Sequence, residues 1–165
     1  MQQFTGAMQG LVSLVGRLAL AAVFLASLVS MLPPRFSATV EVMKSQGVPN
    51  PTFALFGAIG LLLIGGIAVV LGAWTRFGAI FLFVFLAAAT FYFHDFWTFA
   101  DPKIRQDQTI QFMKNLAVGG GLLALVAFGG GPWSIDGWIA LKQEEAESAA
   151  PARASRSASK LQQAA

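Results

Sequence analysis

Four long runs of apolar residues alternate with short polar stretches along the chain. The runs cover about residues 11–32, 53–74, 77–94 and 112–130. Each has about 17 to 22 residues, the length that roughly 30 Å of hydrocarbon requires at about 1.5 Å per helical residue. Because a segment in lipid must pair its own backbone N–H and C=O groups, each run predicts an α-helix. The pattern predicts an all-α integral membrane protein, with a four-helix bundle in residues 1–138.

Proline and glycine mark where these helices end. The first run stops at Pro33-Pro34, and the second follows the turn-forming segment 47–51. Only residues 74–76 separate the second and third runs, so we expect two antiparallel neighbours. The 33–52 and 94–111 connections then lie on the same side of the membrane. A cleaved signal peptide is the alternative for the first run, but its uncharged lead-in and the Pro-Pro exit argue against it.

The chain changes character after Trp138. Three glutamates within 144–147 give way to an Ala- and Ser-rich stretch that carries the last basic residues. Such a segment cannot bury a core, so we expect residues 139–165 to form a disordered tail, with a short interfacial helix as an option at its start. Four spans place both termini on one side, which has six Lys and Arg against five on the other. This difference gives almost no orientation bias; we favour cytoplasmic termini.

The composition supports membrane insertion and excludes several kinds of chemistry. Only 12% of the 165 residues are charged and the mean hydropathy is +0.65, whereas a soluble domain carries about a quarter charged residues. The basic residues are spread singly, so no nucleic-acid surface is expected. With no cysteine and one histidine, the chain lacks the ligands for thiolate metal sites, a metal centre or a covalently bound cofactor. A redox role would depend on a partner or a diffusible cofactor.

Polar residues gather where the third run ends and the fourth begins. His94, Asp95, Trp97, Lys114 and Asn115 should lie at one membrane–water level. This placement predicts a polar pocket at the mouth of the bundle, in which a histidine exchanges a proton near neutral pH. The carboxylate would orient the imidazole, and the indole would stack on an aromatic head group such as a quinone. The alternative is interfacial anchoring, because aromatic residues gather at head-group level and lysine snorkels outward.

Arg17 is the intramembrane charge of the sequence, about two turns inside the first run. A charge at that depth costs several kcal/mol unless it is paired, so it is a functional candidate. Snorkelling, or a bond to a loop carbonyl, is an equal alternative. The acids nearest to its end of the bundle lie in the 136–147 segment, and none of the four runs contains an acid. Ion-coupled transport therefore loses support.

Short stretches in order along the chain resemble a known family. These stretches are Gly16-Arg17-Leu18, Gly47-Val48-Pro49, Gly65-Gly66, Leu71-Gly72-Ala73-Trp74-Thr75-Arg76, Phe93-His94-Asp95-Phe96-Trp97, Phe112-Met113-Lys114-Asn115-Leu116-Ala117 and Gly131-Pro132-Trp133-Ser134-Ile135-Asp136. On them, from about residue 12 to 137, the chain resembles the DoxX family of small bacterial four-helix membrane proteins. Many members have Lys near the end of the first helix and Glu within the second, where this chain has Met31 and Leu62. The departure lowers the expectation of independent catalysis.

The resemblance implies a bacterial inner-membrane protein associated with oxidoreductase systems. We therefore expect an accessory or anchoring subunit of such a system, without stand-alone catalytic activity. Its expected partners are the lipid bilayer, an oxidoreductase subunit and further copies of itself. Two alternatives stay open: a binding protein or carrier for a small lipophilic molecule such as a quinone, and a passive structural membrane protein.

Overall fold

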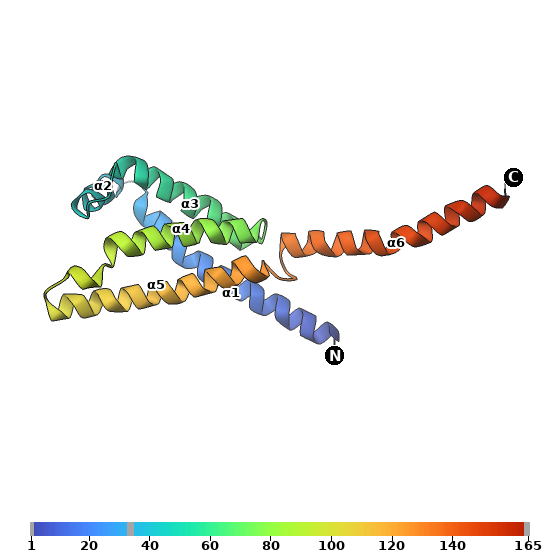
Figure 1. The fold of residues 1–165 in the computed structure, drawn as a ribbon, viewed down its shortest axis with the longest axis horizontal. Coiled ribbons are helices and arrows are strands. Elements are labelled where there is room, and N and C mark those ends of the chain that lie inside the picture. The colour runs from blue at the N-terminus through green and yellow to red at the C-terminus, as the bar shows by residue number, and fades with distance from the viewer. Residues whose placement is uncertain (1, 33–34, 164–165) are drawn as a thin grey trace.

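The computed structural model describes residues 2–32 and 35–163, with side chains from residue 6 to residue 151 of that range. The described chain is helical and contains no strand, which confirms the all-α class. The elements run in this order (Figure 1): α1 Gln2–Met31, α2 Phe36–Ser45, α3 Pro51–Leu71, α4 Thr75–Phe93, the 3₁₀ turn η1 Phe96–Thr98, α5 Pro102–Phe128 and α6 Ile135–Gln163.

Four helical segments are long and apolar enough to cross a membrane, as the apolar runs predict. They are Gly6–Met31, Pro51–Leu71, Thr75–Thr98 and Pro102–Phe128. Large apolar side chains cover their outer surface: Phe53 is 80% exposed and Phe128 is 84% exposed. In water such a surface would be costly, whereas in a bilayer these side chains contact lipid.

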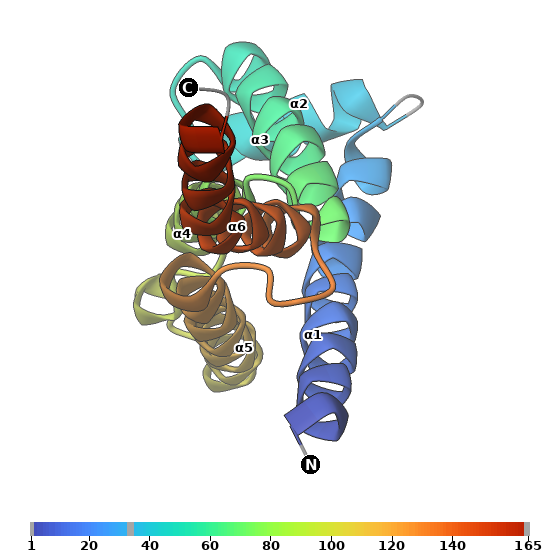
Figure 2. The ribbon, with the colours of Figure 1, turned by 90° about the vertical axis from the view of Figure 1, so that its right-hand side faces the viewer.

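The four spanning helices pack in the order α1, α3, α4 and α5. α3 packs against both α1 and α4, and α4 packs against α5, while α1 and α5 touch only slightly; Figure 2 shows these two helices apart at the side that carries the N-terminus. Each spanning helix contributes to one core, which includes Phe24, Leu62, Leu82 and Leu122, all 0–1% exposed. α3 and α4 approach each other closely, since a Cβ on Gly65 would lie 2.9 Å from the Gly78 carbonyl oxygen.

Two helical segments lie outside the apolar runs, which mark only the parts in lipid. α5 begins at Pro102 instead of near residue 112, because the Asp101 side chain accepts hydrogen bonds from the backbone N–H groups of Lys103 and Ile104. The 33–52 connection contains α2, which packs on α3 through a small cluster around Met43 and Leu55.

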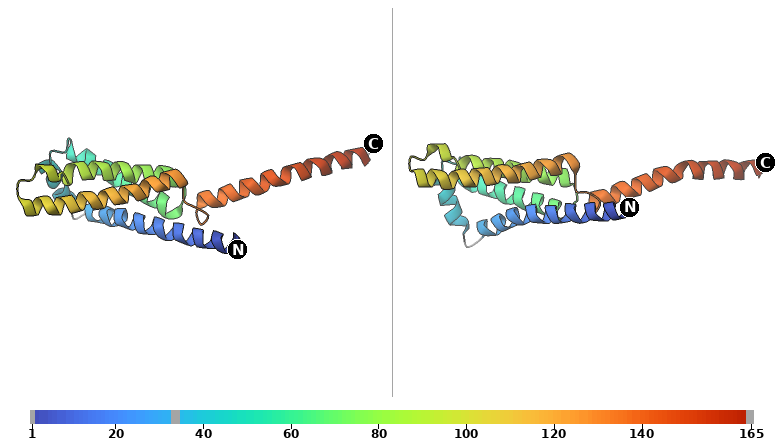
Figure 3. Two further views of the ribbon diagram at one scale, coloured as in Figure 1. Left: turned by 60° about the horizontal axis from the view of Figure 1, so that its bottom comes forward. Right: turned by 90° about the horizontal axis from the view of Figure 1, so that it is seen from below.

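The tail differs from the predicted disorder. From Ile135 to Gln163 the chain forms one helix, α6, which extends away from the bundle (Figure 3). Ser134 begins it, since its hydroxyl accepts a hydrogen bond from the Gly137 N–H at 2.9 Å. Its first turns expose the apolar side chains of Ile135, Trp138 and Ile139. The rest is rich in alanine, glutamate and other good helix formers, with Pro151 inside the helix. The absence of a core does not require the absence of a helix. Residues 164–165 of the predicted tail lie outside the described range.

Candidate functional site

Arg17 is buried at the end of the bundle that carries the termini and bonds to backbone oxygens of two distant segments. It is 1% exposed. Its Nη1 donates to the carbonyl oxygens of Val69 and Val70, both at 3.2 Å, and its Nη2 donates to that of Trp133. The two valines belong to the last turn of α3, where carbonyls have no partner within the helix. The guanidinium therefore serves as a cationic cap for α3, placed favourably at the negative end of the helix dipole.

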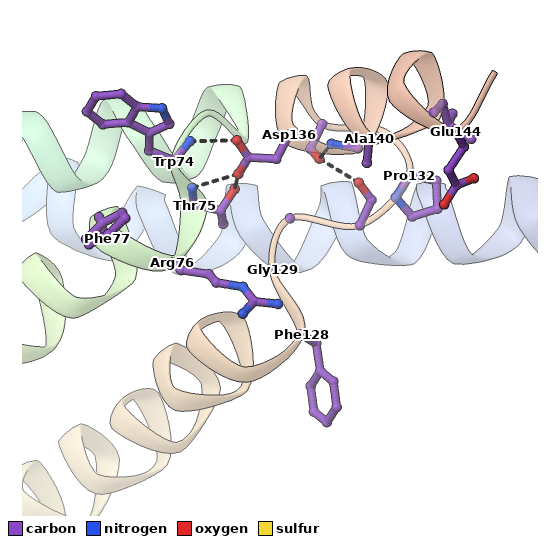
Figure 4. A pocket seen from close by; sticks show the side chains of 15 residues that line it. Trp74, Thr75, Arg76, Phe77, Phe128, Gly129, Pro132, Asp136, Ala140 and Glu144 are labelled. Carbon is purple, nitrogen blue, oxygen red and sulfur yellow. Dashed lines mark hydrogen bonds between the residues drawn. The ribbon is translucent and has the colours of Figure 1, made fainter. Parts of the chain in front are cut away.

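Asp136 makes the matching contact at the start of α4. Its carboxylate accepts hydrogen bonds from the N–H groups of Trp74 and Thr75 and from the Thr75 hydroxyl, each at 2.8 Å (Figure 4). Its own N–H donates to the Gly72 carbonyl oxygen at 2.9 Å. An anion at a helix N-terminus is stabilised by the unpaired N–H groups there. Burial raises the pKa of Asp136, but the hydrogen bonds from Thr75 and Trp74, together with the Arg17 charge, bring it below its ordinary value.

The loop between α5 and α6 joins these two contacts. The Ser13 hydroxyl of α1 donates to the Gly130 carbonyl oxygen at 2.6 Å, and a Cβ on Gly130 would lie 2.6 Å from the Thr75 hydroxyl oxygen. Ser13, Arg17, Thr75, Ser134 and Asp136 thus form one group, named here the Arg17–Asp136 cluster. It ties α1, the α3–α4 turn and the α5–α6 loop together, so each of its polar atoms has a structural use, apart from the buried Arg17 Nε, which has no partner in the described chain.

Sequence reasoning identified Arg17 but not its partners as a set. It placed the acids of 136–147 at the same end of the bundle without selecting Asp136 or Thr75. The available signal was the resemblance itself, because three of the stretches that carry it meet in this cluster: 16–18, 71–76 and 131–136.

The five residues of the predicted polar pocket lie at the opposite end, and the structure does not bring them into one cavity. His94 follows the last residue of α4, and its Nδ1 is 2.8 Å from the Gln108 Oε1 of α5. Asp95 accepts a hydrogen bond from the Thr98 hydroxyl at 3.0 Å. Lys114 is exposed and donates to Gln111. Neither Asp95 nor Lys114 lines either of the two cavities at this end.

His94 lines the larger cavity at this end, of about 430 Å³, named here the His94 cavity. The ends of α1 and α4, the start of α3 and the inner face of α2 enclose it. Its lining is almost wholly apolar and includes Met31, Met43, Leu55 and Phe85. The Tyr92 ring also lines it, next to the histidine. The cavity therefore joins an apolar interior to a polar mouth at the membrane–water level.

Trp97 and Asn115 line a separate cavity of about 340 Å³ between α4 and α5, named here the Asn115 cavity. The Asn115 Nδ2 donates to the Thr90 hydroxyl oxygen at 2.9 Å, which joins the two helices inside the apolar region. The Trp97 and Phe112 rings meet edge to face, with centroids 6.2 Å apart. Across residues 2–32 and 35–163, no group of three His, Asp or Glu side chains could hold a metal ion.

Comparison with known proteins agrees with this architecture. The family model described as DoxX matches residues 12–95, which contain most of α1 and all of α2, α3 and α4. Inner membrane protein YqjF of Escherichia coli K12 is 37% identical over 101 residues, 61% of this chain and 72% of that protein. Inner membrane protein YphA of the same organism is 32% identical over 102 residues, 61% and 71% of the two chains. No solved structure matches. The chain belongs to the DoxX family.

Proposed function

We propose that this DoxX-family membrane protein binds a small lipophilic molecule, such as a quinone, in the His94 cavity. The observation that carries the proposal is an apolar cavity of about 430 Å³ with a histidine and a tyrosine at one end. Ligand sites commonly combine an apolar wall with a few polar groups that orient the ligand. A molecule with a lipophilic body and a polar head fits this division.

The polar groups at the cavity suit a head group that gains and loses protons. With Gln108 Oε1 as the acceptor, the His94 proton is on Nδ1, and Nε2 carries the lone pair of the neutral ring. Within the described part of the chain, Nε2 has no hydrogen-bond partner. In this tautomer Nε2 can accept a hydrogen bond from a quinol hydroxyl. Tyr92, which also lines the cavity, carries a hydroxyl that can donate a hydrogen bond.

Two matched variants on α4 test which cavity binds the ligand. Ala89 lines the His94 cavity and Ala87 lines the Asn115 cavity, so Ala89→Leu and Ala87→Leu each fill one of them. We expect Ala89→Leu and His94→Phe to weaken binding of decylubiquinone to the detergent-solubilised protein, while Ala87→Leu and Lys114→Gln bind it as the wild type does. Equal binding by all five proteins would refute the proposal.

A second candidate function is an accessory or anchoring subunit of a membrane oxidoreductase system, and α6 is the observation that favours it. This helix extends beyond the bundle and exposes Glu144, Glu145 and Glu147. A helix that extends beyond the bundle with exposed acidic side chains offers a docking surface for a partner. Purification in mild detergent should then recover a cofactor-bearing oxidoreductase, and replacing the three glutamates with lysine should release it, whereas Glu41→Lys on α2 should not. Recovery of the chain alone would contradict this role.

If substitutions at His94 and in α6 change only stability, the protein is a structural membrane component.

For the orientation of the protein in the membrane, we propose that both termini lie on the cytoplasmic side. Reporter fusions at residue 165 and within the 94–101 connection should give opposite topology signals, and an extracytoplasmic signal at residue 165 would reverse this assignment.

A further inference from the structure

A third cavity lies at the end of the bundle that carries the termini. It has a volume of about 560 Å³ and is bounded by the start of α4, the end of α5, the α5–α6 loop and the start of α6 (Figure 4). Arg76, in the first turn of α4, extends along this loop: a Cβ on Gly129 would lie 3.7 Å from the Arg76 Nε. The cavity is separate from the His94 cavity: the start of α4 lines it, whereas the end of α4 lines the His94 cavity.

The lining of this cavity, as far as the structure describes it, contains the base Arg76 and the acids Asp136 and Glu144. Glu144 is exposed on α6 and lies at the far side of the cavity from Arg76 (Figure 4). The Asp136 carboxylate is occupied by the Trp74 and Thr75 groups and lies near the Arg17 charge. Over the part of the chain with described side chains, Arg76 forms neither an ion pair nor a hydrogen bond with the protein. Arg17, by contrast, donates hydrogen bonds to three carbonyl oxygens.

The apolar part of the lining shows at which depth a ligand would lie. Phe77 follows Arg76 and is 62% exposed, and Phe128 is the last residue of α5. Both rings stand at the ends of membrane-spanning segments, together with Trp74, which is 78% exposed. Aromatic side chains at span ends mark the head-group level of a bilayer. The guanidinium therefore lies where lipid phosphates are, with apolar walls towards the acyl chains.

We propose that this cavity binds the phosphate of an anionic phospholipid, with Arg76 as its ligand and the Phe77 and Phe128 rings against the acyl chains. A guanidinium binds phosphate oxygens through paired N–H groups. The α5–α6 loop leaves space beside Arg76 at Gly129, where a Cβ would meet only the Arg76 Nε, at 3.7 Å. The aromatic walls favour a lipid over a soluble phosphate, and basic pockets between helices are a common mode of lipid head-group recognition.

Native mass spectrometry of the detergent-solubilised full chain tests this site. The protein is mixed with phosphatidylglycerol or phosphatidylcholine of the same acyl chains, and the bound fraction is compared for wild type, Arg76→Gln and Arg35→Gln. Arg35 is an exposed arginine on the α2 side and lines none of the cavities described above. We expect Arg76→Gln to lower phosphatidylglycerol retention about fivefold, whereas Arg35→Gln should retain as much of this lipid as the wild type. The three proteins should differ little in the amount of phosphatidylcholine that they retain.

Thermal unfolding and competition by inorganic phosphate distinguish lipid binding from misfolding and from binding of a soluble anion. Because Arg76 has no hydrogen bond or ion pair among the described side chains, the thermal midpoint of Arg76→Gln without added lipid should equal that of the wild type. A loss of lipid then cannot be assigned to misfolding. Inorganic phosphate at millimolar concentration should not displace phosphatidylglycerol. Unchanged retention in Arg76→Gln, equal retention of the two lipids, or displacement by inorganic phosphate would each overturn the proposal.

Discussion

At the end of the bundle that carries the termini, Arg17 and Asp136 bind backbone groups of distant segments. At the α2 end, His94 and Asn115 each form one side-chain hydrogen bond and line a cavity. The first end uses buried Arg17 and half-buried Asp136 to cap two helices, beside the unpaired Arg76 of the described chain. The second leaves polar atoms next to open apolar space. Fixed contacts hold the helices in place, and uncommitted polar groups are available for ligands.

Removal of the Arg17 charge should cause the largest loss of stability. In Arg17→Met, three carbonyl oxygens of α3 and the α5–α6 loop lose their donor within the bundle. We expect a cost of about 3 kcal/mol, because buried acceptors are left unpaired and the cap of α3 is lost. Thermal unfolding in detergent should show a clear fall in midpoint. An unchanged midpoint would mean that this end is not the fixed one.

Asp136→Asn should have a smaller effect of the same kind. The amide keeps the size of the carboxyl group, but its NH₂ cannot accept the hydrogen bonds that Thr75 donates to Asp136. A loss of about 1–2 kcal/mol is expected from the missing hydrogen bonds and from the lost anion at the α4 N-terminus. Glu147→Gln, an exposed change on α6, is the matched control and should leave the midpoint in place. Equal midpoints for Asp136→Asn and this control would show that the Asp136 contacts contribute nothing.

Acid should weaken the same end selectively. Because the pKa of Asp136 is lowered in the folded protein, its stabilising contribution is complete above the unfolded value of about 3.9 and is lost as the pH falls through the lower folded value. The thermal midpoint of the wild type should therefore decrease below about pH 4 more steeply than that of Asp136→Asn. Parallel curves for the two proteins would contradict this assignment of the charge.

Substitutions at the α2 end should have the smallest effect on stability. Asn115→Leu removes one hydrogen bond between α4 and α5, and side-chain bonds of this kind inside membranes contribute about 0.6 kcal/mol on average. His94→Phe removes only the bond to Gln108. Both midpoints should stay within a few degrees of the wild type, while His94→Phe alone weakens ligand binding. A large destabilisation by either change would remove the contrast between the two ends.

The sequence predicts the spans well because lipid imposes one simple rule on each of them. It does not predict α2, the early start of α5 or the helix α6, since these segments leave the lipid and follow capping and propensity instead. The same limit applies to the candidate sites. Sequence position gives the depth of His94 and Asn115 in the membrane, but not the direction in which each side chain points.

The direction depends on local geometry and on distant partners. His94 lies beyond the last helical turn with φ −131° and ψ 37°, so helical periodicity does not place it. Asn115 turns towards Thr90, 25 residues earlier in the chain. Arg17 could be recognised as an unusual intramembrane charge, but its acceptors are 52 to 116 residues away, a separation that no local pattern encodes.

This separation also sets an order of events during biosynthesis. Arg17 enters the membrane with the first helix, 52 residues before Val69 is made and 116 residues before Trp133. Until the ribosome has produced the α5–α6 loop, the guanidinium lacks its full set of acceptors and Asp136 is not yet present. A nascent chain that stops short of this loop therefore lacks the Trp133 acceptor of the Arg17 Nη2, and an incompletely paired charge in a membrane helix is costly.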